Sequence, residues 1–110
     1  MTEVQKVEEV VQSQWFQSVL SKAEGGFDAI MVLAHMGYSD PLVEVILHRI
    51  REICGDKMPV QFITGHTHIR ANKQLDYYSS SFEAGRFLDT IGLVSFPTLN
   101  SNSTDANSTR

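Results

Sequence analysis

This sequence of 110 residues has little of what several protein classes require. Cys54 is its only cysteine, so no disulfide bond can form within the chain. Its nine Lys and Arg residues are scattered, and its formal net charge is −4. That charge argues against a nucleic acid polymer as the main partner, because phosphate backbones need clustered basic residues. No apolar run approaches the roughly 18 residues of a membrane span.

The beginning of the chain also lacks the pattern of a signal peptide. A polar, amphipathic segment follows Met1, where a signal peptide would have a basic and then an apolar region. Two interpretations follow. A complete chain would be cytosolic, whereas a piece of a longer precursor could be vacuolar or secretory. The sequence leaves both open.

What is present predicts one small domain. Apolar residues make up 42 % of the chain, which is enough for a modest core. We expect residues 1–96 to form this domain. Residues 97–110 are rich in Ser, Asn and Thr and predict a disordered tail or linker. Two glycosylation sequons begin there at Asn102 and Asn107, although such patterns arise easily in this composition.

The first element expected is a helix over residues 2–24. Thr2 and Gln5 fit the capping-box pattern, and Gly25-Gly26 would end the helix. Apolar side chains at spacings of three and four form one stripe: Val4, Val7, Val11, Trp15 and Val19. The stripe predicts a helix that faces the core. Pairing with a second helix is the alternative, for which the stripe is short.

The middle of the chain predicts a strand, a helix and a second strand. Residues 28–34 form a continuous apolar run, typical of a strand buried on both faces. Asp40 as N-cap, Pro41 in the first helical position and Gly55 at the C′ position delimit the helix. The next strand begins at Pro59-Val60. This βαβ unit indicates an α/β fold with parallel strands.

Two more strands complete the predicted sheet. Residues 72–76 read as a polar loop, and residues 77–82 and 86–96 as strands broken at Ala84-Gly85. The fold class is therefore α/β: a layered sheet with flanking helices, in the order helix, strand, helix, strand and then two strands.

Three histidines follow the two parallel strands. His35 stands where the first strand should end, and His66 and His68 lie on the turn after the second. Carboxyl ends of adjacent parallel strands meet at one edge of a sheet, so we expect the three imidazoles to converge. Neutral imidazole is a common metal ligand, and Gly65 would permit a sharp, positive-φ path that presents both rings. Three such ligands with open positions are typical of a catalytic metal site.

Other candidate residues have simpler interpretations. His48 lies in the middle of the predicted helix and is expected on its surface. Cys54 is expected to be a small, buried or half-buried apolar residue, with a reactive thiol as the alternative. Arg70 follows the histidine turn and could contact a phosphate oxygen or remain a solvated loop residue.

Together these segments match a known family. Ala34-His35-Met36-Gly37 after a strand, then a helix, a strand and Gly65-His66-Thr67-His68, resembles the C-terminal half of a calcineurin-like metallophosphoesterase domain. The stretch 79–88 is similar to the strand pair that follows this motif in the 5′-nucleotidase branch. Gln14-Trp15-Phe16 resembles the opening helix of fungal members. The resemblance covers residues 4–96.

The resemblance implies a β-sandwich flanked by helices that holds two divalent metal ions, with Zn, Mn or Fe as candidates. His35 and His66 would bind one ion and His68 the other. Paired ions generate a hydroxide and hold the oxygens of a transferred phosphoryl group. The implied substrates are phosphate monoesters or 5′-nucleotides, which Arg70 could contact.

The sequence departs from the family in its missing carboxylates. The motifs DxH, GDxxD and GNH[DE] are absent, and Asp56 follows a glycine without a second Asp three residues later. We therefore expect part of a phosphoesterase that is inactive alone. The alternative is a non-catalytic module that binds a metal or a partner, including a second copy through uncovered apolar surface. A purely structural α/β protein, with accidental histidine spacing, is a third hypothesis.

Overall fold

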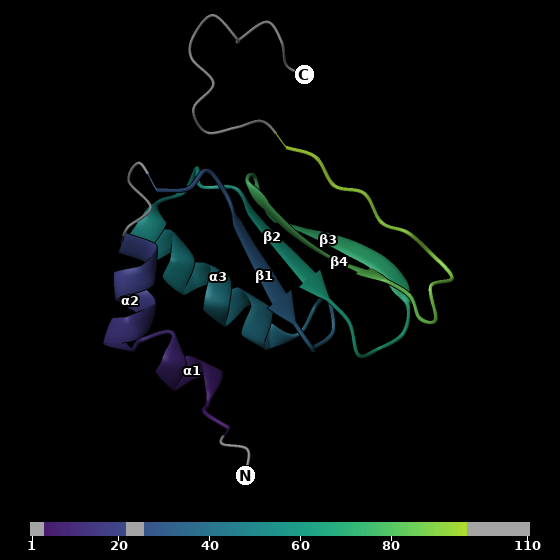
Figure 1. Cartoon of the computed structure of the whole chain (residues 1–110), viewed down its shortest axis with the longest axis horizontal. Coiled ribbons are helices and arrows are strands. Elements are labelled where there is room, and N and C mark those ends of the chain that lie inside the picture. Colours follow the sequence, from purple (N-terminus) through teal and green to yellow (C-terminus); the bar gives the residue numbers. More distant parts are fainter. Residues whose placement is uncertain (1–3, 22–25, 97–110) are drawn as a thin grey trace, which may run out of the picture.

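The computed structural model describes residues 4–21 and 26–96. Its elements, in chain order, are α1 (Val7–Val10), α2 (Gln14–Ser21), β1 (Ile30–Ala34), α3 (Pro41–Cys54), β2 (Val60–Thr64), β3 (Arg70–Asp76) and β4 (Ser79–Ala84) (Figure 1). The predicted cap at Thr2, the helix end at Glu24 and the tail 97–110 lie outside the described residues. No helix within 4–21 or 26–96 is both long and apolar enough to cross a bilayer.

The four strands form one mixed sheet in the order β1-β2-β4-β3. β1, β2 and β4 run parallel, and β3 pairs antiparallel with β4. α3 connects β1 to β2, so the predicted βαβ unit is confirmed. Ile30 pairs with Val60 and Ala34 with Thr64, so these two strands end side by side. The residues that follow them therefore leave the sheet at the same edge (Figure 1).

α3 begins and ends where the sequence predicts. The side chain of its N-cap, Asp40, accepts a hydrogen bond of 2.9 Å from the Leu42 N–H, and Pro41 takes the first turn. Gly55 follows with φ of 89°, a conformation that costs glycine little, and its N–H donates to the Arg51 carbonyl. Local chemistry alone thus delimits the central helix.

The core lies between the helices and one face of the sheet. Its buried members are Leu20, Val43, Leu47, Ile50, Met58, Val60 and Phe62. Phe62 of the inner strand β2 and Val43 of α3 have no exposed surface. Burying side chains of this size contributes about 1.5–3 kcal/mol each, so this contact between α3 and β2 anchors the βαβ unit.

The N-terminal segment, predicted as one helix, forms two short helices instead. A turn separates α1 from α2, because the Ser13 hydroxyl accepts from the Phe16 N–H at 3.2 Å and donates to the Val10 carbonyl at 2.6 Å. Ser competes well for such cap positions, and here it starts a new helix. The break rotates the apolar stripe: Val11 is buried, whereas Trp15 is 67 % exposed.

The prediction that the first strand is buried on both faces is also wrong. β1 lies at the edge of the sheet, and its residues alternate between half-buried and exposed. Met31 and Leu33 are 65 % and 74 % exposed. Ile30 and Val32 pack against the core on the opposite face. Helices cover only one face of this strand, a property that its own sequence does not reveal.

The segment predicted as a polar loop is a strand. Residues 72–76 belong to β3, an edge strand that needs few apolar residues because one side of it meets solvent. Tyr77 and Tyr78, predicted to be in a strand, form the hairpin turn instead. Asp76 accepts from the Tyr78 N–H at 2.9 Å and pairs through both carboxylate oxygens with Arg51 of α3, at 2.9 and 3.0 Å. This ion pair joins the hairpin to the helix.

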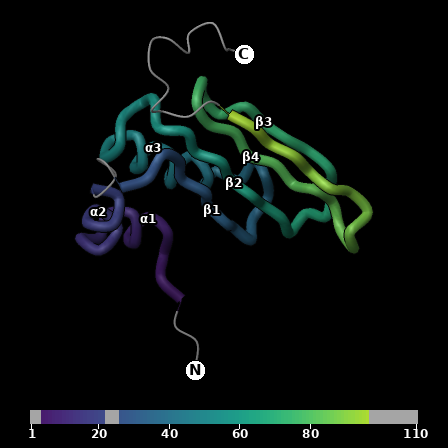
Figure 2. The backbone as a smooth tube through the Cα atoms, turned by 45° about the horizontal axis from the view of Figure 1, so that its top comes forward, coloured from purple at the N-terminus to yellow at the C-terminus, as the bar shows by residue number. Residues whose placement is uncertain are grey.

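Residues 86–96, predicted as a strand, form none. Figure 2 shows this segment, in yellow-green, running along β3 and β4. Phe87 and Leu88 have positive φ angles, which interrupt an extended path. Gly92 lies against the ring of Phe82, so close that an added Cβ would stand 2.7 Å from it. The segment thus approaches the sheet through the backbone at Gly92, with most of its side chains exposed, and does not form a further paired strand.

Candidate metal centre

His35 and His66 meet at the carboxyl ends of β1 and β2. The Nε2 atom of His35 lies 3.0 Å from Nδ1 of His66, and the ring centroids are 4.9 Å apart at 67°. Both rings are solvent-exposed. This distance is that of a hydrogen bond between the two rings, whose donor depends on the tautomer of each. The two nitrogens therefore lie close together at the edge of the sheet.

The turn that carries His66 has a strained backbone and is hydrogen-bonded to the loop after His35. His66 and His68 have φ angles of 89° and 65°, which are uncommon outside glycine. The positive φ expected at Gly65 falls on these two histidines, because the described glycines with positive φ are Gly55 and Gly85. The Gly65 N–H donates to the Met36 carbonyl at 3.0 Å. This backbone bond joins the turn to the loop after His35.

The structure brings together two of the three predicted histidines. His68 is exposed on the same turn, but no three His, Cys, Asp or Glu residues gather as a metal-binding group anywhere in 4–21 or 26–96. The role of His68 stays a prediction. Arg70, the first residue of β3, is exposed and borders a shallow hollow between β3, β4 and residues 93–94.

Sequence reasoning missed Glu83, which lies beneath the two histidine loops. It is only 3 % exposed, on the face of β4 that also buries Ser79 and Ser81. Its carboxylate accepts from the Tyr38 N–H at 2.8 Å and from the Thr67 hydroxyl at 2.7–2.8 Å. The alternation of Ser79, Ser81 and Glu83 at every second position was the available signal, because it places all three on one face.

The remaining candidate residues lie away from this edge. His48 is exposed on α3, 3.8 Å from Glu52, as predicted for a surface residue of the helix. Cys54 is half-buried with its Sγ 3.7 Å from the Leu20 carbonyl. Burial raises the pKa of the Cys54 thiol, and the nearby Arg51 charge offsets this only in part. Its thiolate, the reactive form, is therefore disfavoured.

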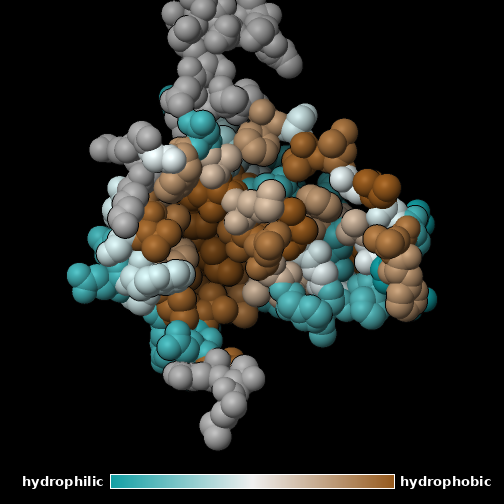
Figure 3. Space-filling view, viewed as in Figure 1, coloured by the Kyte–Doolittle hydropathy of each residue, from teal (hydrophilic) through white to brown (hydrophobic). Residues whose placement is uncertain are grey.

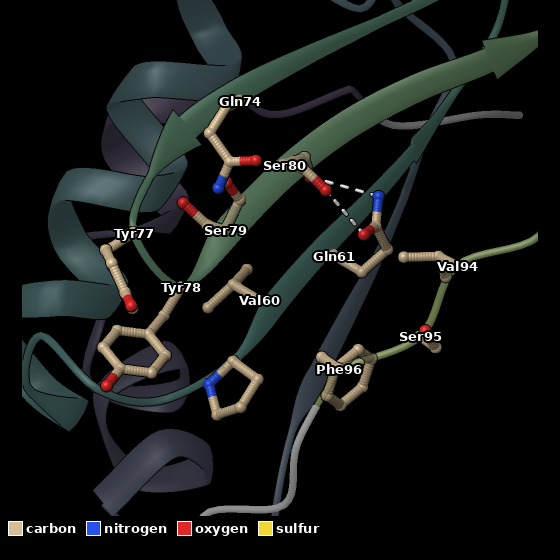
Figure 4. Close-up of a pocket in the computed structure, with 11 residues that line it drawn as sticks. Val60, Gln61, Gln74, Tyr77, Tyr78, Ser79, Ser80, Val94, Ser95 and Phe96 are labelled. Atoms are coloured by element: carbon tan, nitrogen blue, oxygen red, sulfur yellow. Dashed lines mark hydrogen bonds between the residues drawn. The ribbon is translucent and has the colours of Figure 1, made fainter. Parts of the chain in front are cut away.

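A hollow of about 330 Å³ lies at the opposite end of the sheet, where β2 and β4 begin (Figure 4). Its lining combines aromatic rings with polar side chains, several of which already form hydrogen bonds. Gln61 accepts from the Ser80 hydroxyl at 2.8 Å, and the Gln74 amide donates to the Ser79 carbonyl at 3.1 Å. These polar groups hold the strands in place, so the histidine edge is the better candidate site.

Sequence comparison finds fungal proteins that match most of this chain. No protein-family model matches the chain. An uncharacterised protein of Saccharomyces cerevisiae is 37 % identical over 93 residues, which cover 81 % of this chain and 15 % of that protein. An uncharacterised protein of Schizosaccharomyces pombe is 31 % identical over 101 residues, 92 % of this chain and 16 % of its own length. The chain thus spans about a sixth of these relatives.

The fold is similar to that of a solved structure. The crystal structure of a 5′-nucleotidase from Candida albicans superposes with a TM-score of 0.68 at 25 % identity. The match covers 77 % of this chain and 15 % of that one. The chain therefore has a 5′-nucleotidase-like fold, with a four-stranded sheet and flanking helices. The predicted resemblance to 5′-nucleotidases is therefore confirmed at the level of fold.

Proposed function

We propose that this chain supplies His35, His66 and His68 to a two-metal phosphoesterase site and does not hydrolyse substrate by itself. The observation that carries the proposal is the 3.0 Å separation of the His35 and His66 nitrogens, at the strand ends of a 5′-nucleotidase-like fold. Ligands of open α/β sheets gather at such edges.

The two nitrogens fit a shared divalent ion. Two nitrogens that each lie about 2.0–2.1 Å from one ion stand about 2.8–3.4 Å apart at angles of about 90–109°. The observed separation falls within that range. Imidazole suits Zn and Fe. Mn is kept as a third candidate because the family resemblance implies it. Bound ions would supply a hydroxide at neutral pH and neutralise charge on a phosphoryl group.

The residues of this chain would bind and orient. His35 and His66 would hold one ion from two loops, and His68 would face a second ion. Arg70 is exposed two residues further on, where its planar guanidinium could pair with phosphate oxygens of a monoester or 5′-nucleotide. Because the sequence lacks DxH, GDxxD and GNH[DE], another segment would have to provide the bridging carboxylate.

Calorimetric titration with Zn²⁺ and Mn²⁺ tests the proposal. We expect His66→Ala to weaken binding at least tenfold, as loss of a direct ligand should, whereas His48→Ala on the α3 surface leaves it unchanged. The isolated chain should hydrolyse p-nitrophenyl phosphate no faster than buffer. Equal affinities of His66→Ala and His48→Ala would contradict metal binding by His66. Robust turnover by the isolated chain would show that the absent motifs are dispensable.

A second candidate function is a binding module, favoured by an uncovered apolar surface. Met31 and Leu33 are exposed on the edge strand β1, and a hollow of about 390 Å³ beside them is lined largely by apolar residues of α1, α2, β1 and α3. In Figure 3 the hydrophobic residues gather where Figure 1 shows α2, α3 and β1. Exposed patches of this kind favour association.

We propose that a second copy of the chain covers this surface. Sedimentation equilibrium should then give a mass above that of the monomer, and Leu33→Glu should return it to the monomer. Ile91→Glu is the matched control, because Ile91 is 92 % exposed outside the paired strands. A monomeric wild-type chain at high concentration would rule this partner out.

A further inference from the structure

Buried Glu83 connects the two loops that carry His35 and His66. It belongs to β4, which pairs with β2, and its carboxylate lies under the sheet edge where β1 and β2 end. A buried carboxylate is costly unless hydrogen bonds replace its water. The bonds that replace it come from a backbone amide in one histidine loop and a hydroxyl in the other.

In the first loop, Glu83 holds Tyr38, three residues after His35. The Tyr38 N–H donates to Oε1 of Glu83 at 2.8 Å. The Tyr38 carbonyl accepts from the Ser81 hydroxyl at 2.6 Å. Ser81 and Glu83 point to the same face of β4. This strand therefore holds both the N–H and the carbonyl of Tyr38.

In the second loop, Glu83 holds Thr67, which separates His66 from His68. The Thr67 Oγ1 lies 2.8 Å from Oε1 and 2.7 Å from Oε2, so its hydroxyl can donate to either oxygen. Both flanking histidines have positive φ, a conformation that persists only where the surroundings hold it. The bond from Thr67 to Glu83 fixes the centre of this strained turn.

The two loops also touch each other at this point. A Cβ added to Gly37 would stand 3.1 Å from the Thr67 Cγ2 and 3.7 Å from Oε1 of Glu83. One carboxylate oxygen therefore lies at the junction of both loops. A displacement of Glu83 would move Tyr38 and Thr67 together, and with them the segments that present His35 and His66.

We infer that Glu83 is a positioning residue that sets the separation of the His35 and His66 nitrogens and thereby the affinity of this pair for a divalent metal. The inference deepens the proposed function and rests on it. Replacing a residue that hydrogen-bonds to metal ligands and orients them typically lowers metal affinity about 10–100-fold. Here the orienting bonds act on the backbones of the loops, not on the imidazoles.

Zinc affinity, measured by calorimetry, tests the inference with two variants at Glu83. We expect Glu83→Ala to bind Zn²⁺ about 10–100-fold more weakly than the wild type. Glu83→Gln should stay within about threefold, because its amide oxygen accepts from Tyr38 and its NH₂ group donates to the Thr67 oxygen. Asp76→Asn controls for general destabilisation, since that carboxylate also ties two elements together but at the other end of the sheet.

Thr67 provides an independent pair of variants if Glu83→Ala does not fold. Thr67→Val removes the hydroxyl with little change of shape and should lower zinc affinity about tenfold, whereas Thr67→Ser retains the hydroxyl and should bind normally. A folded Glu83→Ala or Thr67→Val chain with wild-type affinity would overturn the inference.

The metal-free chain gives a readout that separates this inference from the proposed function. If the wild type binds no zinc, the metal site fails, but proton NMR still reports contact between the His35 and His66 rings. Loss of that contact in Thr67→Val, with retention in Thr67→Ser, would support positioning by Glu83. Retention of the contact in both variants would reject it.

Discussion

The Nε2 atom of His35 lies 3.0 Å from the Nδ1 atom of His66, although 31 positions separate the two residues in the chain. The contact follows from the register of β1 and β2, in which Ala34 and Thr64 pair as the last residues of their strands. Each histidine follows its strand by one or two residues, so parallel pairing brings them together. The βαβ unit therefore brings both residues to one edge of the sheet, where the hydrogen bonds of Glu83 hold their two loops.

We expect a divalent metal to stabilise the chain through this pair. A ligand that binds only the folded state at 100 times its Kd adds about 2.7 kcal/mol to the free energy of unfolding. Thermal unfolding with Zn²⁺ and then with a chelator should show a reversible rise in Tm for the wild type. Because each variant should bind at least tenfold more weakly, His35→Ala and His66→Ala should each reduce the added stability to about 1.4 kcal/mol or less at the same Zn²⁺ concentration. A full rise in either single variant would contradict a shared ion.

The ion pair of Asp76 with Arg51 should make stability depend on pH. Burial raises the pKa of the Asp76 carboxyl, but the bonds from Arg51 and the Tyr78 N–H, with the Arg51 charge, outweigh it and hold this pKa below its usual 3.8. A lowered folded pKa adds stability above the unfolded pKa of about 3.9, and the contribution disappears as pH falls through the folded value.

Asp76→Asn should therefore lower the free energy of unfolding at pH 7 by about 1 kcal/mol, a figure reduced for the partial exposure of Asp76. The difference from the wild type should narrow below about pH 4. Urea unfolding across this range measures both quantities, with the exposed Asp56→Asn as a control. A difference that is constant with pH would show that the loss is not electrostatic.

The contribution of the Asp40 capping bond to stability should be separable from that of the Asp40 charge. Asp40→Ala removes the acceptor for the Leu42 N–H and should lower the free energy of unfolding by about 1 kcal/mol. Asp40→Asn keeps an acceptor oxygen and should cost only a few tenths. Chemical denaturation of both variants compares them. An equal loss in the two would assign the effect to charge at the helix N-terminus.

Cys54 should react slowly in the folded chain. Its pKa is raised by burial, with partial compensation by the Arg51 charge, so less thiolate is present at neutral pH than for a free cysteine. We expect a thiol reagent such as a disulfide dye to modify the native chain at least about tenfold more slowly than the chain unfolded in urea. Equal rates in the two states would refute this account of the thiol.

Much of the fold follows from local sequence. Asp40, Pro41 and Gly55 delimit α3 because capping and turn chemistry act over a few residues. The apolar runs predict β1 and β2, and their connection through one helix predicts that they pair in parallel. From these elements alone His35 and His66 were expected at one edge of the sheet, where the structure places them.

Only the tertiary structure decided what each element meets. The apolar run of β1 does not reveal that this strand lies at the edge of the sheet with Met31 and Leu33 exposed. The polar sequence of β3 does not reveal that it is a strand. Both properties depend on neighbours that are distant in the chain. The buried Glu83 reads as an ordinary charged residue until Tyr38 and Thr67 surround it. The sequence determined which residues could form the site, and the packing of distant loops determined how they are held.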